Sequence, residues 1–112
     1  MFKGSPQPFE QLFWANQHMV VGTTYRSIPV IDIQVPNRAI YIVSTRPGTA
    51  SIKIPEGGVW NWTGNWVKYD SFTITEGGKL NTYYTDKPLG CFRLDVKLNT
   101  DGIVTAWTML EP

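Results

Sequence analysis

The side chains that could perform acid–base, nucleophilic or metal chemistry are few in this chain of 112 residues. It has one histidine, His18, one cysteine, Cys91, and nine carboxylates that occur singly along the sequence. Catalysis by proton transfer or by a nucleophile needs several such groups to converge, and a zinc site needs several Cys or His ligands. We therefore predict no catalytic, metal or cofactor site and a protein that is not an enzyme. A dyad of Cys91 and His18 would form only if the fold joined them.

Three tryptophans lie within seven residues, at Trp60, Trp62 and Trp66. Tryptophan combines a large apolar ring with one N–H donor, and it is enriched at binding interfaces. Trp60 and Trp62 would share one face of a strand, with Trp66 at the start of the returning strand. Three interpretations remain open: an aromatic plug in the core, a platform that stacks on sugar rings, and a protein–protein contact. The two binding interpretations require exposed rings.

The N-terminal segment, residues 1–17, has a different pattern from the rest of the chain. In a short helix Phe9, Leu12 and Phe13 would share one face, with Trp14 alongside. A helix of this length is marginal by itself, so its apolar face must dock on its own domain or on a neighbouring subunit. We therefore interpret residues 1–17 as an N-terminal arm and these four side chains as a candidate interface.

From residue 18 to residue 112, short β-type runs alternate with turn residues. The clearest prediction is a hairpin formed by Phe92–Leu98 and Ile103–Leu110, joined by the turn Asn99–Gly102. Several such runs at roughly 8–12-residue spacing predict one antiparallel all-β sandwich domain over residues 18–112. A jelly roll is the leading topology. An immunoglobulin-like sandwich is second, because its cysteine pair is absent.

Composition argues against several classes of partner. Ten Lys and Arg against nine Asp and Glu give a net charge of +1, and the cations are spread along the chain without a run. Nucleic acid is not an expected partner, because phosphate binding depends on concentrated positive charge. No apolar stretch approaches the ~20 residues of a membrane span, so no membrane contact is expected. A single cysteine cannot form an intrachain disulfide, which favours synthesis in a reducing cytosol.

Two strand–turn segments are alike in sequence, Ile52–Gly58 and Phe72–Gly78, and both end in Glu-Gly-Gly. Together with the chain length, the all-β pattern and the apolar arm, they make the chain resemble the small capsid-decorating (cement or staple) proteins of tailed bacteriophages. This resemblance implies a jelly roll that forms homo-oligomers and binds the major capsid protein, or another virion protein, on the outer capsid surface. It also implies synthesis in the host cytoplasm. No site residue is carried over, because the resemblance contains no shared motif.

The expected function is therefore that of a structural virion protein that decorates and reinforces a phage capsid. Weak contacts repeated around a closed lattice would add by avidity. The alternative is a carbohydrate-binding β-sandwich, or a phage fibre or receptor-binding module, that uses Trp60, Trp62 and Trp66. Coplanar exposed rings would favour glycan binding, whereas rings sunk between the sheets would leave the arm as the main adhesive element.

Overall fold

The computed structural model describes residues 9–32, 35–58, 63–75, 77–87 and 89–111 of the chain. Within these ranges the chain forms nine strands and no helix. The strands are β1 (Phe9–Met19), β2 (Tyr25–Arg26), β3 (Val30–Ile31), β4 (Asn37–Ser44), β5 (Gly48–Pro55), β6 (Trp66–Ile74), β7 (Leu80–Thr85), β8 (Cys91–Leu98) and β9 (Gly102–Glu111).

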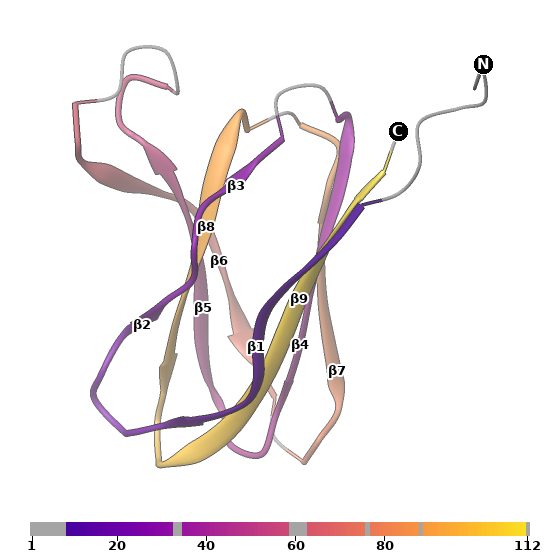
Figure 1. Cartoon of the computed structure of the whole chain (residues 1–112). Coiled ribbons are helices and arrows are strands. Elements are labelled where there is room, and N and C mark those ends of the chain that lie inside the picture. Colours follow the sequence, from indigo (N-terminus) through magenta and orange to yellow (C-terminus); the bar gives the residue numbers. More distant parts are fainter. Residues whose placement is uncertain (1–8, 33–34, 59–62, 76, 88, 112) are drawn as a thin grey trace.

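The strands form two antiparallel sheets that pack face to face (Figure 1). One has the order β1-β9-β4-β7, and the other has the order β2-β8-β5-β6 with β3 also paired to β8. Each strand of the first half pairs with its counterpart in the second half: β1 with β9, β2 and β3 with β8, β4 with β7, and β5 with β6. This arrangement is a long hairpin folded over on itself, which is a jelly roll. The predicted sandwich and its leading topology are confirmed.

Alternate side chains of the central strands fill the space between the two sheets. On β8, the four apolar side chains from Phe92 to Leu98 are buried, as their alternation predicts. The predicted hairpin of Phe92–Leu98 with Ile103–Leu110 is wrong, because β8 and β9 lie in opposite sheets and each pairs with other strands. The turn between them crosses from one sheet to the other, so their apolar sides face each other across the core. The other central strands contribute further fully buried residues: Ile40, Ile42, Ala50, Ile52, Val104 and Ala106. Because side chains on a strand alternate between its two faces, the residues between these core positions point outward.

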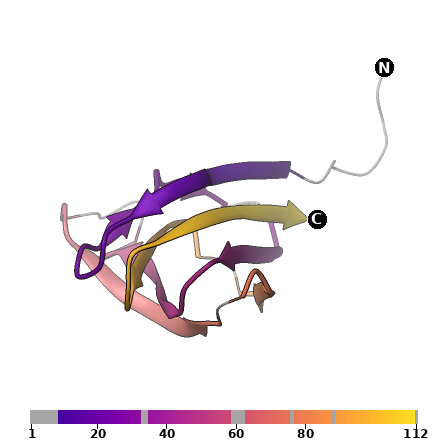
Figure 2. The same cartoon turned by 90° about the horizontal axis from the view of Figure 1, so that it is seen from below.

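The prediction of a short helix within the N-terminal arm is wrong, because Phe9–Met19 forms an edge strand. It pairs with β9 from Phe9 opposite Leu110 to Met19 opposite Gly102, and Figure 2 shows the two strands side by side. A short isolated helix is only marginally stable, so the backbone hydrogen bonds and packing gained by joining the sheet favour the strand. The register shifts on both sides of Trp14, and the backbone at Asn16 has a positive φ of 51°. These irregularities bend an edge strand and redirect its side chains.

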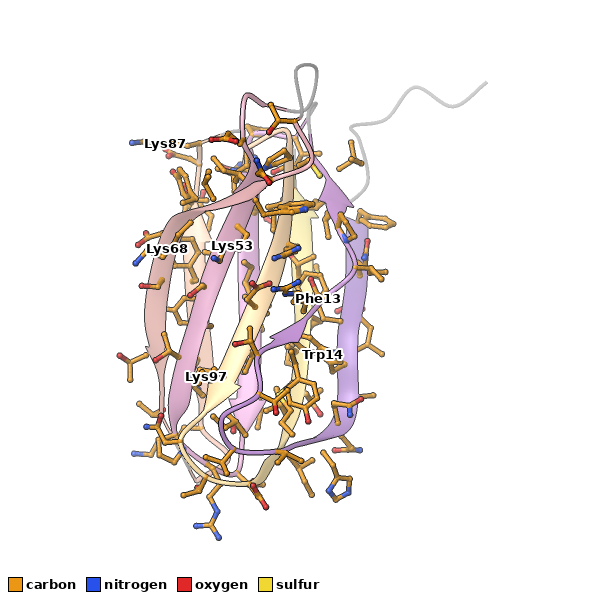
Figure 3. The ribbon with its side chains drawn as sticks, turned by 90° about the vertical axis from the view of Figure 1, so that its left-hand side faces the viewer. Phe13, Trp14, Lys53, Lys68, Lys87 and Lys97 are labelled. Atoms are coloured by element: carbon orange, nitrogen blue, oxygen red, sulfur yellow. The ribbon has the colours of Figure 1, made fainter. Side chains whose placement is uncertain are left out.

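Side chains close the gap between the sheets on both sides. On one side, Tyr83 Oη on β7 donates to Asp70 Oδ2 on β6 at 2.7 Å, and the Tyr83 ring stacks on Phe72 at 5.4 Å. Burial and the Asp70 carboxylate raise the pKa of Tyr83, whereas the hydrogen bond from Tyr83 lowers the pKa of Asp70. On the other side, Phe13 and Trp14 from β1 pack against the core (Figure 3).

A buried ion pair holds the end of the sandwich where β3 leads into β4. The Arg38 guanidinium contacts the Asp32 carboxylate, and the two side chains are only 1% and 0% exposed. The guanidinium also donates to the backbone carbonyls of Val35, Thr85 and Lys87. Burial raises the pKa of the Asp32 carboxyl, and the adjacent guanidinium opposes that shift. Arg38 therefore ties the β3–β4 connection to the β7–β8 connection.

Replacing Arg38 by methionine is expected to lower the free energy of unfolding by about 3–5 kcal/mol, because the Asp32 carboxylate would remain buried without its cation. Denaturation in urea measures this loss, with Arg46→Met as the control because Arg46 is exposed. The double variant Asp32→Leu/Arg38→Met should recover much of the stability, since it removes both buried charges. An Arg38→Met protein as stable as the unmodified chain would contradict this role.

Candidate functional site

The tryptophan cluster is only partly within the described structure. Trp60 and Trp62 lie outside the described residues, so their predicted role stays a prediction. Trp66 begins β6 and is half-buried, and the Arg93 guanidinium lies 4.7 Å from the centroid of its ring. This is cation–π geometry. A sugar that stacked on this face of Trp66 would have to displace Arg93.

The four apolar residues of the predicted arm divide into two pairs. Phe13 and Trp14 are partly buried against the core, with ring centroids 6.2 Å apart. Phe9 and Leu12 remain 52% and 55% exposed. Two of these side chains therefore stabilise their own domain, and two are available for contact with another molecule. Residues 9–17 are part of the sheet and not a separate leader.

We call the outer surface of the β1-β9-β4-β7 sheet the apolar face. Most of the exposed apolar side chains of that sheet lie on it. The strand register aligns them in rows, of which one runs Leu12, Trp107, Tyr41 and Thr82 across all four strands. Leu80 and Tyr84 on the edge strand β7 are 55% and 61% exposed. The outward side chains of these strands are Glu10, Leu12, His18, Asn37, Ala39, Tyr41, Val43, Leu80, Thr82, Tyr84, Ile103, Thr105, Trp107, Met109 and Glu111. None of these is Lys or Arg.

At the centre of the apolar face, Tyr41 and Trp107 are partners on neighbouring strands. Their ring centroids are 5.4 Å apart and their planes differ by 22°. Near-parallel rings at this separation must overlap, since two coplanar rings lying side by side would be farther apart. One face of each ring is therefore turned toward the other ring. The two rings are stacked on each other and do not form the coplanar exposed platform that would favour glycan binding.

The outer surface of the β2-β8-β5-β6 sheet, here called the basic face, has the opposite character. It carries five cations from four strands: Arg26, Lys53, Lys68, Arg93 and Lys97. Asp95 is the carboxylate on this face among the described strand residues, and Arg93 pairs with it at 2.9 Å. Figure 3 shows Lys53, Lys68 and Lys97 on this sheet. Sequence reasoning missed the cluster because residues far apart in the chain form it.

The two side chains with the clearest catalytic potential are at opposite ends of the sandwich. His18 is exposed and lies opposite Ile103, near the start of β9. Cys91 is buried at the start of β8, opposite Ile31, and burial and Asp32 raise its thiol pKa. The fold therefore does not form a Cys91–His18 dyad.

Within the described ranges, no three His, Cys, Asp or Glu residues gather to hold a metal ion. In that same part of the chain, there is no helix with the length and apolar character needed to cross a membrane.

Comparison with known proteins gives a likeness in fold. No family model matches the chain, and no curated protein matches it. Among solved structures, the chain is similar to PBSX exported protein XepA, with a TM-score of 0.64 and 12% sequence identity. The match covers 92% of this chain and 37% of the XepA chain, so the chain spans little more than a third of that protein. At this identity, the likeness shows a shared fold.

Alanine substitutions on β1 should separate packing from surface positions. Trp14→Ala is expected to lower the free energy of unfolding by about 3 kcal/mol, because Trp14 packs against the core. Leu12→Ala should change it by less than about 0.5 kcal/mol, because Leu12 is mostly exposed. Urea denaturation of both variants tests the assignment, and an equal loss of stability in the two would overturn it.

Proposed function

We propose that the protein is a structural component of a phage particle and that it adheres to a neighbouring protein subunit through its apolar face. In its specific form, the proposal is that the protein decorates and reinforces a capsid by binding the major capsid protein lattice. The observation that carries it is an outward sheet surface of stacked and exposed apolar side chains that lacks Lys and Arg among its described residues. The fold that the chain shares with PBSX exported protein XepA, a phage-related protein, is consistent with a phage component.

The chemistry of the apolar face fits a buried contact. Removing an ammonium or guanidinium group from water costs free energy unless a partner compensates it. The ionisable side chains of this face lie toward its two ends: Glu10 near the start of β1 and Glu111 at the end of β9, with His18 near the other end of β1. The centre, with Trp107 and Tyr41, has neither an acidic nor a basic side chain. A partner can therefore cover the centre of the apolar face without burying an unpaired charge.

The size of the apolar face favours a weak contact that gains strength by repetition. Four strands about 4.8 Å apart and eight residues that rise about 3.4 Å each span roughly 500 Å² in projection. A standard interface buries about 800 Å² on each partner. One copy on one subunit would therefore bind weakly. Several linked copies around a lattice would bind much more tightly by avidity, which is what a homo-oligomeric decoration protein requires.

The carbohydrate-binding alternative that depends on ring stacking gains no support from the described aromatic residues. Arg93 covers one face of Trp66, and Tyr41 and Trp107 stack on each other and do not form a coplanar platform. Stacking on a pyranose needs an open ring face. The apolar face therefore favours a protein partner.

A charge placed on the apolar face should weaken adhesion selectively. Leu80→Arg is expected to reduce co-sedimentation with capsid shells at least tenfold, because docking would bury an unpaired guanidinium. Thr73→Arg is the matched control, since Thr73 is also an exposed position on an edge strand but belongs to the other sheet. Both variants should unfold at nearly the same urea concentration as the unmodified protein.

Three results would contradict the proposal in different ways. If the unmodified protein does not sediment with the shells, capsid decoration is wrong. If Leu80→Arg binds as tightly as the unmodified protein, the apolar face is not the contact. If Thr73→Arg loses as much binding as Leu80→Arg, the contact lies on the other sheet or depends on overall charge.

A further inference from the structure

The basic face concentrates positive charge that the rest of the molecule does not share. Five of the ten cations of the chain lie on it, although the net charge of the whole chain is only +1. Arg93 pairs with Asp95 through two contacts, at 2.9 and 3.3 Å. Of the other four cations, Lys68 interacts electrostatically with Asp70 at the sheet edge, and Arg26, Lys53 and Lys97 form no ion pair with the described residues. Their charge is therefore available to an external anion.

The cations are interleaved with hydroxyl groups in a regular grid. Lys97 lies opposite Thr49, Asp95 lies opposite Ser51, and the next strand continues these rows with Thr73 and Ser71. Positions two residues apart on a strand are about 7 Å apart, and adjacent strands are about 4.8 Å apart. The face therefore offers charged and neutral hydrogen-bonding groups at spacings comparable to those of a sugar chain.

A shallow hollow of about 210 Å³ lies in this face. Every side chain around it is polar or charged. It is lined by Thr24, Thr49, Ser51, Lys53, Asp95 and Lys97. Its two lysines outnumber its one carboxylate, Asp95, which is already paired with Arg93. The hollow therefore suits a small, hydrated, negatively charged group, and its wall offers hydroxyls to neighbouring hydroxyls of the ligand.

We infer that the basic face binds an acidic polysaccharide. Lys53 and Lys97 would contact carboxylate or sulfate groups, with Arg26 extending the positive surface, while Thr49 and Ser51 would hydrogen-bond to sugar hydroxyls. The inference rests on the complementarity between the cations of this face and the acidic groups of the polymer. The hydroxyl groups between the cations favour a sugar polymer over other polyanions. The site lies on the sheet opposite the apolar face. It goes beyond the proposed function, because both faces can be occupied at once.

The shape and chemistry of the basic face fit nucleic acid less well. The major groove of a DNA duplex admits a helix or a two-stranded ribbon, whereas this face is a flat sheet of several strands. Single-stranded nucleic acid is held largely by bases that stack on exposed aromatic rings. The described aromatic ring at this face, Trp66, has one side covered by Arg93. Nucleic acid is therefore the competing outcome of the test.

The test measures binding of the full chain to alginate, which is carboxylated, and to heparin, which is sulfated, with neutral dextran as a blank. Lys53→Glu/Lys97→Glu is expected to weaken binding to at least one acidic polymer at least tenfold. Lys79→Glu/Lys87→Glu is the control, because it makes the same change in net charge at positions outside the basic face. It should change binding less than threefold. Binding should weaken as salt increases, since solvent-exposed charges are screened.

Several outcomes would overturn the inference. These are no binding of the unmodified protein to either acidic polymer, unchanged binding by the Lys53→Glu/Lys97→Glu variant, and an equal loss in the control variant. Tighter binding to single- or double-stranded DNA of equal charge would assign the face to nucleic acid instead. Circular dichroism and urea denaturation check that both variants are folded. Co-sedimentation with capsid shells should be unaffected by Lys53→Glu/Lys97→Glu, which separates this inference from the proposed function.

Discussion

Both sheets of the sandwich must turn every second side chain into one shared core. The antiparallel pairing of the first half of the chain with the second half sets the register of all the strands. Once the inner positions, such as Ile42, Ile52 and Leu94, are buried, the residues between them have to point outward. A shift of one residue in any strand would exchange its inner and outer side chains. The composition of the two outer surfaces is therefore a direct consequence of how the core is filled.

The two outer surfaces differ in chemistry, since one is mainly apolar and the other is basic and rich in hydroxyl groups. One sheet presents Leu12, Tyr41 and Trp107 without a nearby cation, and the other presents Lys53 and Lys97 with hydroxyls between them. Exposed apolar patches commonly mark interaction sites, so the first surface favours a protein that contacts a partner. The separation of the two surfaces allows one to hold the protein to an assembly while the other faces outward.

Much of the fold could be predicted from local patterns, but the surfaces could not. The alternation in Phe92–Leu98 and the turn after it predict two strands, which form as β8 and β9, because both signals are local. The predicted pairing of these two strands as a hairpin is wrong, since which sheet each strand joins depends on the whole topology. The helix predicted for the N-terminal segment does not form: its apolar spacing fits a helix, but pairing with the edge of β9 makes it a strand. The ion pair of Asp32 and Arg38 gives no local signal, because burial of a charged residue depends on the loops that enclose it.

The candidate surfaces depend on strand order, which a single sequence does not show. The sequence draws attention to the tryptophans near residue 60, yet the described apolar surface is built around Trp107 and Tyr41 from strands far apart in the chain. The cations of the basic face are likewise isolated in the sequence and come together only in the sheet.

Residue-level footprinting of the protein bound to its assembly tests the central claim most directly. Oxidative labelling of Trp107, Met109 and Tyr84, together with amine labelling of Lys53 and Lys97, reports on both surfaces in one sample. The account predicts strong protection of the three apolar-face residues on binding, with both lysines still reactive. Protection of the lysines with unchanged labelling of Trp107, Met109 and Tyr84 would contradict it.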